Sequence, residues 1–171
     1  ENIIYISDNI GYLYAYDLNK RKILWAKNFN VPFRSNIKVY SNKLLVANQN
    51  NDFYFINISN GEILKKIPTE ETKINNKFIN NLSIKDDVTF FLNTFGSLYA
   101  LDNNKMNIIW FMSLNQSLDL NPGNLFFSNQ VINYKNKTIV SSNKYLHVLN
   151  SENGSTIFKK NFTSLVKPLI I

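Results

Sequence analysis

The sequence predicts an all-β fold built from four copies of a small antiparallel sheet. A short apolar segment ending in Asp or Asn recurs four times, and a bulky residue follows most copies at a fixed distance. Composition agrees, because 13 Phe and 9 Tyr among 171 residues suit strands better than helices. With 44% hydrophobic residues, a chain of this length can bury a core of its own.

The recurring segment is a run of apolar and aromatic residues closed by an Asx residue. Its four copies are Leu13–Asp17, Phe53–Asn57, Leu98–Asp102 and Leu146–Asn150. The closing residues stand 40, 45 and 48 positions apart. Eight positions after each of them comes Trp25, Lys65, Trp110 or Phe158. A constant offset inside a variable period indicates hairpins of fixed geometry joined by loops of different length, and therefore a structural repeat.

Each copy is expected to be the third strand of a four-stranded unit. Its Asx side chain can accept hydrogen bonds from backbone N–H groups just ahead, and Gly61 and Gly154 supply positive φ four positions later, so a turn to a fourth strand should follow. Second strands are expected at Ile3–Ser7, Leu44–Ala47, Thr89–Asn93 and Lys137–Ser142, with Gly11 and Gly96 in the turns that follow two of them. First strands are expected within Phe33–Tyr40, Phe78–Ile84 and Leu125–Tyr134.

The third strands are apolar on both faces, as in Leu98–Leu101. A strand with one wet face would alternate, whereas a strand between two neighbouring sheets need not. Four-stranded units of this period that are buried on both sides are typical of β-propeller blades. We therefore expect one propeller segment over residues 1–171, with blades at 1–30, 31–72, 73–117 and 118–165, and the first strand of a next or closing blade at 166–171.

The same residues resemble the PQQ-like repeat, whose consensus reads roughly G-x-L-Y-A-L-D-x-x-T-G-x-x-x-W. Gly96–Asp102 followed by Trp110 matches it closely, and Gly11–Asp17 followed by Trp25 nearly as well. In the other two copies Asn57 and Asn150 replace the Asp, while Lys65 and Phe158 replace the Trp. The resemblance covers essentially the whole chain. It implies that Trp25 and Trp110 pack against a neighbouring blade and that Asp17, Asn57, Asp102 and Asn150 close the turns.

The family includes quinoprotein dehydrogenases, BamB-type lipoproteins of outer-membrane β-barrel assembly, and sensor domains. The dehydrogenases typically hold their quinone with a vicinal Cys pair, and this chain has no cysteine. Proline-led first strands at Val31–Ser35 and Val166–Leu169 favour the BamB type. We therefore expect a bacterial, periplasmic, non-catalytic protein-interaction scaffold that works without a cofactor or a metal, with the outer-membrane assembly machinery as partner. A quinone-dependent dehydrogenase and a ligand-sensing ectodomain stay open as alternatives.

Charge gives no support for nucleic acid as a partner. The net charge is +7, but the lysines are scattered, and the densest groups, such as Lys20–Lys22, fall beside turns. The one histidine, His147, takes the register of Tyr14, Tyr54 and Tyr99, so it is interpreted as a packed aromatic rather than a ligand.

Two places are candidates for partner binding. Arg34 lies early in a first strand, where it could face a central channel, and Arg is favoured at protein interfaces. Leu118, Asp119 and Leu120 lie in a long connection beside Pro122 and Gly123, and loops on a rigid scaffold often carry function.

The ends of the chain raise the question of how the propeller closes. An unpaired apolar edge such as Leu169–Ile171 is sticky, so a partner strand is expected for it. That partner could be Ile3–Ser7 of the same chain, giving a four-bladed ring, or of another segment, giving an eight-bladed ring. Since the family usually closes with seven or eight blades, the segment is interpreted as half of an eight-bladed propeller, completed by a second copy or by the rest of a parent protein.

Overall fold

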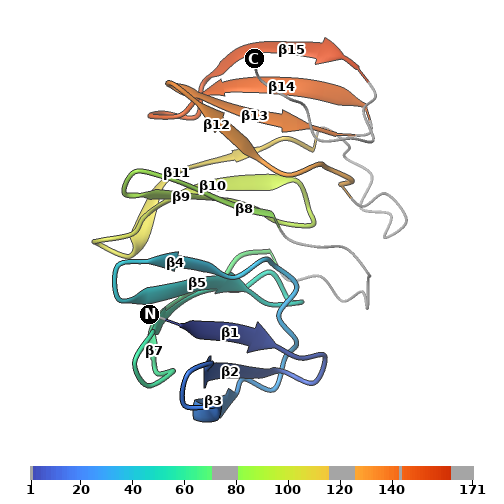
Figure 1. Cartoon of the computed structure of the whole chain (residues 1–171). Coiled ribbons are helices and arrows are strands. Elements are labelled where there is room, and N and C mark those ends of the chain that lie inside the picture. The colour runs from blue at the N-terminus through green and yellow to red at the C-terminus, as the bar shows by residue number, and fades with distance from the viewer. Residues whose placement is uncertain (1, 71–80, 116–125, 143, 163–171) are drawn as a thin grey trace. The chain divides into compact units, whose positions relative to one another are not determined.

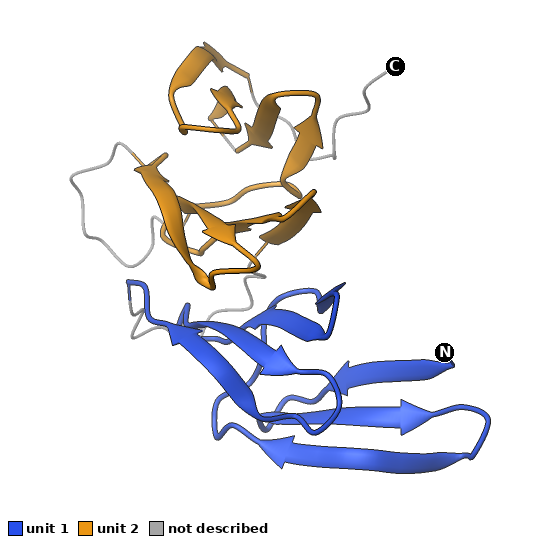
Figure 2. Ribbon diagram, turned by 90° about the vertical axis from the view of Figure 1, so that its left-hand side faces the viewer, with its two compact units in different colours: residues 1–77 blue, residues 78–171 orange. Residues whose placement is uncertain are grey.

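The computed structural model describes residues 2–70, 81–115, 126–142 and 144–162. These residues form fifteen β-strands in four antiparallel sheets and no helix (Figure 1). No segment that could cross a membrane as a helix occurs in the part of the chain so described. The chain divides into two compact units, Glu1–Lys77 and Phe78–Ile171, and each holds two of the sheets (Figure 2).

The sheets of unit 1 run in chain order from strand to strand. The first sheet consists of β1 (Ile3–Ser7), β2 (Tyr12–Asp17) and β3 (Lys22–Asn28). The second consists of β4 (Lys38–Tyr40), β5 (Lys43–Ala47), β6 (Phe53–Asn57) and β7 (Ile63–Ile67). Simple up-and-down order leaves the last strand of each sheet, β3 or β7, as an edge.

Unit 2 repeats this arrangement with two four-stranded sheets. The third sheet consists of β8 (Asn81–Lys85), β9 (Val88–Leu92), β10 (Ser97–Asp102) and β11 (Asn107–Ser113). The fourth consists of β12 (Ile132–Tyr134), β13 (Lys137–Ser141), β14 (Tyr145–Asn150) and β15 (Thr156–Asn161). The sequence therefore predicted the second and third strands of all four sheets to within about one residue.

All four sheets share one irregularity, which marks them as copies of a single unit. The pairing of the last two strands shifts register at the same repeat position, two residues before the closing Asx. The shifts lie at Ala15/Tyr16, Phe55/Ile56, Ala100/Leu101 and Val148/Leu149. A bulge increases the local twist and bends the outer strand. The recurring register shift therefore sets the direction in which the bulky side chain that follows it points.

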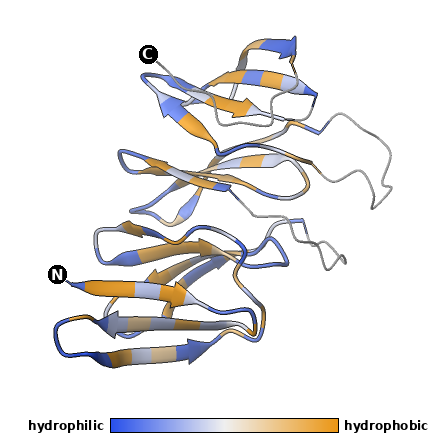
Figure 3. Cartoon of the chain, turned by 45° about the vertical axis from the view of Figure 1, so that its right-hand side comes forward, coloured by the Kyte–Doolittle hydropathy of each residue, from blue (hydrophilic) through white to orange (hydrophobic). Residues whose placement is uncertain are grey.

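Each unit has its own hydrophobic core, formed between the facing surfaces of its two sheets. In unit 1 the core joins Leu13, Ala15 and Trp25 of the first sheet to Val46 and Ile56 of the second. The core of unit 2 is built from Phe90, Leu92, Leu98, Ala100, Leu114, Val131, Val140 and Leu149. Figure 3 shows the hydrophobic residues concentrated along the strands and the hydrophilic ones at the turns.

The first strands are shorter than expected. β4 and β12 have three residues each, and within the expected stretches Phe33 and Ser128 make only isolated bridges, to Asn48 and Ser142. In the second sheet the reason is that a side chain replaces a backbone partner. The N–H of Ala47 donates to the hydroxyl of Ser35 (2.8 Å) instead of to a carbonyl, so the regular ladder stops.

Candidate protein-interaction site

The Asx residue that closes each repeat organises the turn to the outer strand. Asp17 Oδ1 accepts hydrogen bonds from the N–H groups of Asn19 and Lys20, both at 2.9 Å. The bond from Lys20 is the main reason that the pKa of the Asp17 carboxyl lies below its usual value, and burial opposes the shift. Asn57, Asp102 and Asn150 accept equivalent bonds from the residue two positions ahead.

A second set of turns, between the second and third strands, is braced in the same way, and the sequence analysis did not identify the side chains that brace them. There one side-chain oxygen accepts two backbone N–H groups, and the four residues that supply it are Asp8, Asn48, Asn93 and Ser142. A signal was available, because these residues precede the closing Asx by nine positions in three copies and by eight in the last. Every blade thus has a rigid turn at both ends of its third strand.

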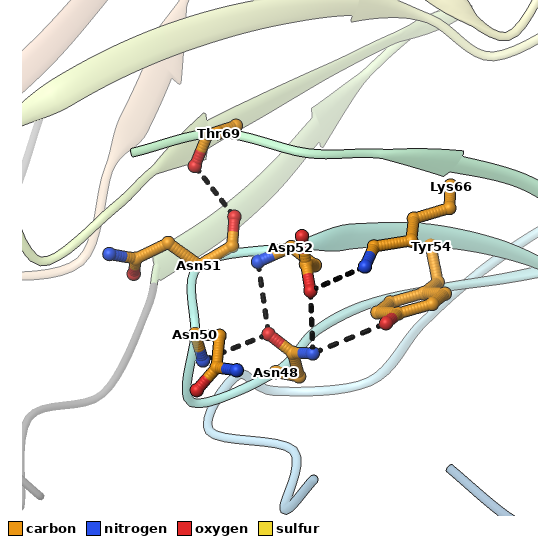
Figure 4. A network of polar contacts seen from close by, with 7 residues as sticks. All are labelled: Asn48, Asn50, Asn51, Asp52, Tyr54, Lys66 and Thr69. Carbon is orange, nitrogen blue, oxygen red and sulfur yellow. Dashed lines mark hydrogen bonds and ion pairs between the residues drawn. The ribbon is translucent and has the colours of Figure 1, made fainter. Parts of the chain in front are cut away.

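The most extensive of these turns is centred on Asn48 (Figure 4). Its buried side chain accepts hydrogen bonds from the N–H groups of Asn50 and Asp52, both at 2.9 Å. Its Nδ2 donates to Asp52 Oδ2 (3.1 Å) and to the hydroxyl of Tyr54 (3.2 Å). Asn51 takes the positive φ that Gly11 and Gly96 adopt in the equivalent turns, and its carbonyl accepts a hydrogen bond from Thr69 Oγ1 (2.6 Å).

An ion pair extends this turn onto the outer strand. Lys66 Nζ lies 2.9 Å from Asp52 Oδ2 and 5.7 Å from the centre of the Tyr54 ring. The hydrogen bond to Asp52 raises the pKa of Lys66, and burial raises the pKa of the Tyr54 hydroxyl. Both groups therefore keep their protons at neutral pH, and the cluster presents a fixed pattern of donors.

Replacing Asn48 by Ala should lower the free energy of unfolding by about 2 kcal/mol, because the partly buried N–H groups of Asn50 and Asp52 and the Tyr54 hydroxyl lose their hydrogen bonds to the Asn48 amide. Chemical denaturation followed by circular dichroism measures this loss. Asn50→Ala is the matched control, since only the backbone of Asn50 takes part in the network. Equal losses for both variants would show that the amide of Asn48 does not hold the turn.

Arg34 lies beside this turn. Its N–H donates to the carbonyl of Ala47 (3.0 Å), and the N–H of the neighbouring Gln49 donates to the carbonyl of Pro32 (2.8 Å), so the backbone on both sides is fixed. The guanidinium makes one long hydrogen bond, from Nη2 to Gln49 Oε1 (3.5 Å). Its buried Nε has no partner, and among the described residues no carboxylate lies within ion-pair distance of it. A guanidinium has five N–H donors, so most of those of Arg34 are available.

The other sequence-predicted partner-binding residues, Leu118, Asp119 and Leu120, lie outside the described residues. The two tryptophans lie where the outer strand meets the neighbouring sheet of the same unit. Trp25 Nε1 donates to the carbonyl of Ile58 and Trp110 Nε1 to that of Ser151, both at 3.0 Å. At the equivalent position in the other sheets, Lys65 is exposed and Phe158 is 46% exposed.

His147 is packed inside unit 2. Its side chain is 3% exposed, makes an edge contact with the ring of Tyr145 and pairs across the strand with Lys159. Burial lowers the pKa of His147 to about 4, and the charge of Lys159 acts in the same direction. The described residues contain no group of three or more His, Asp or Glu side chains arranged to hold a metal ion.

Comparison with solved structures shows the fold. BamB from Moraxella catarrhalis matches with a TM-score of 0.80 and 14% identity over 95% of this chain. The computationally designed protein Ika8 matches with a TM-score of 0.74 and 11% identity over 96%, and Sqt1 from Saccharomyces cerevisiae with 0.73 and 14% over 93%. No protein-family model and no curated protein sequence matches the chain.

These likenesses and the four repeated sheets show that the chain has the β-propeller fold, with four blades' worth of strands. The chain spans 50% of the length of BamB, 48% of Ika8 and 45% of Sqt1. It therefore corresponds to about half of each structure that it resembles.

Proposed function

We propose that this chain is a non-catalytic protein-interaction scaffold that assists the assembly of outer-membrane β-barrel proteins in the bacterial periplasm, as part of a lipoprotein of the BamB type with PQQ-like repeats. Its partner docks on the end of the second blade that carries Arg34 and the Asn48 turn. The observation that carries the proposal is the guanidinium of Arg34. Arg34 is half-buried, its backbone N–H is bound to the carbonyl of Ala47, and its guanidinium is paired with no carboxylate of the described residues.

Such a guanidinium suits a partner that brings a carboxylate. Arg forms two parallel hydrogen bonds with a carboxylate, and a partly desolvated pair of this kind is stronger than an exposed one. The turn beside it adds rigidity, because hydrogen bonds within the chain already hold the backbone of Gln49 and the side chain of Asn48 before another protein binds. A surface that is already ordered loses little conformational entropy on binding. The resemblance of the repeat and the structural likeness to BamB support the choice of outer-membrane assembly proteins as partners.

Arg34→Ala should weaken binding to the purified periplasmic domains of the outer-membrane barrel-assembly machinery by about tenfold or more. Arg34→Lys should recover only part of the affinity, because an ammonium cannot make the paired hydrogen bonds. Isothermal titration calorimetry measures both effects. Lys22→Ala, which removes one exposed charge from β3, is the control for net charge.

The outcomes separate the parts of the proposal. If the wild-type chain does not bind these domains, the assembly role is wrong. If it binds, and Arg34→Ala behaves like Lys22→Ala, the scaffold role stands and the docking surface lies elsewhere.

A further inference from the structure

The outer strands of the four sheets differ in how their free edges are protected. Each sheet ends in a strand whose outer side is paired with no other described strand. Such an edge presents N–H and C=O groups that can bind a further strand, and lysines along the edge oppose that binding. Three of the outer strands carry two lysines each: Lys22 and Lys27 in β3, Lys65 and Lys66 in β7, and Lys159 and Lys160 in β15.

The outer strand of the third sheet, β11, lacks this protection. Its seven residues include no charged side chain. Ile108, Ile109 and Phe111 are 44%, 47% and 55% exposed. A long, apolar and uncharged edge invites pairing with another chain, so proteins keep one where another strand is to be bound and protect the others.

Phe111 lies where two other sheets have a lysine. It pairs with Tyr99 across the strand. The residues at the equivalent position of β7 and β15 are Lys66 and Lys159. The ring of Phe111 stacks on that of Tyr99, with 5.2 Å between the ring centres, so this edge presents an aromatic ring in place of a charge.

The aromatic rings of the third sheet indicate which kind of strand the edge can bind. Phe91 stacks on Tyr99 at 6.0 Å and Tyr99 stacks on Phe111, so a row of three rings crosses β9, β10 and β11 and ends at the open edge. Aromatic and β-branched residues are favourable cross-strand neighbours of such a ring. A charged residue opposite Phe111 would lose hydration without gaining a partner. The edge therefore suits an uncharged strand with an aromatic or β-branched residue opposite Phe111.

Contacts within unit 2 hold β11 in place. The indole of Trp110 lies against Gly154 and donates its N–H to the carbonyl of Ser151. On its inner side the strand pairs with β10 from Asn107 to Ser113, with one register shift. The edge is thus ordered before another strand binds, which lowers the entropic cost of binding.

We propose that the outer edge of β11 binds an extended, uncharged strand of a partner protein, which joins the third sheet by backbone hydrogen bonds and continues its row of aromatic rings. The partner is recognised by its extended backbone and by an aromatic or β-branched residue opposite Phe111. The edge includes none of the residues of the Arg34 surface, so either proposal can fail without the other.

A capped synthetic peptide, Ac-Thr-Val-Thr-Tyr-Thr-Val-Thr-NH2, serves as the probe. Titrated into the isotope-labelled 171-residue chain, it should shift the backbone amide resonances of β11 in the NMR spectrum. Phe111→Lys and Ile109→Lys should each weaken binding by about tenfold or more, because they give β11 the protection that the other edges have. Ile157→Lys is the matched control. Ile157 lies at the same register shift in β15 and is 49% exposed, so its replacement should leave binding unchanged.

A second peptide tests whether the backbone is what β11 recognises. Proline in place of one valine and one adjacent threonine removes N–H groups from both edges of the peptide, so this version should not bind. Each protein variant should keep the circular dichroism spectrum and melting temperature of the wild type, since lysine already occupies the position of Phe111 in β7 and β15.

Four results would overturn the proposal. The β11 amides of the wild-type chain do not respond to the first peptide, or the shifts map to another strand. The proline peptide binds as well as the first, which means that apolar contact and not strand pairing is measured. Phe111→Lys binds like Ile157→Lys. Sedimentation shows that copies of the chain associate through β11 and the peptide does not displace them, so that the occupant is a second copy.

Discussion

Trp110→Ala should lower the free energy of unfolding by about 3 kcal/mol, which is the lower end of the range for aromatic truncation because Trp110 is partly exposed. The loss has identifiable parts. The indole contacts Phe90 at 5.9 Å between ring centres and donates its N–H to the carbonyl of Ser151. Without the indole, the core of unit 2 gains a cavity, and the mostly buried Ser151 loses this donor to its carbonyl. Urea denaturation measures the change.

Gly154→Ala should cost a similar amount for the complementary reason. A Cβ on Gly154 would lie 2.7 Å from Cε3 of Trp110, and φ of +73° adds strain for any other residue. Together these costs come to about 2–4 kcal/mol. In the double variant the clash disappears, because the ring is absent. The double variant should therefore lose about 1–2 kcal/mol less unfolding free energy than the sum of the two single-variant losses.

Arg21→Ala is the control for this pair, since Arg21 occupies the same turn position with φ of 51° and already carries a side chain. Its unfolding free energy should change by less than about 0.5 kcal/mol. Strictly additive losses for Trp110 and Gly154 would mean that the ring does not rest on the glycine.

The contact between Trp110 and Gly154 could be predicted from the sequence only in part. The constant offset from Asx to Trp and the glycine four positions after Asn57 and Asn150 predicted the strands and the turns, and the resemblance to the PQQ-like repeat implied the packing role of the tryptophans. It did not reveal that each tryptophan rests on the glycine of the neighbouring repeat. That contact joins residues 36 or 44 positions apart, and a spacing pattern read within one repeat carries no information about it.

The candidate site was only partly predictable for a related reason. Arg34 could be singled out as a residue type that favours interfaces, but its free donors depend on which side chains surround it in the folded chain. The Asn48 network was missed because Asn is abundant in this sequence and its bracing role depends on Asp52, Tyr54 and Lys66 coming together. The shortened first strand of the second sheet, β4, likewise results from the hydroxyl of Ser35, which accepts a hydrogen bond that a strand carbonyl would otherwise accept.

Acidification from pH 6.5 to about 4 should destabilise the protein through His147. In the unfolded chain the imidazole binds its proton near pH 6.5, whereas burial and Lys159 lower the pKa in the folded chain to about 4. The unfolded state therefore binds more protons in this window, and stability falls as the pH falls. The difference between the unfolded and folded pKa values of His147 corresponds to a loss of about 3 kcal/mol in the free energy of unfolding, which is complete below pH 4.

Two measurements isolate this effect. His147→Phe keeps a packed ring and removes the titration, so the pH dependence of its unfolding free energy should be nearly flat over the same window. Asp8 and Asp17 have pKa values below the usual 3.8, so most of their contribution is lost below this window, and the His147→Phe variant corrects for the part lost near pH 4. Since the chain has one histidine, its proton NMR resonance reports the folded-state pKa directly. A midpoint near 6.5 would show that His147 is solvated and that neither burial nor Lys159 controls its charge.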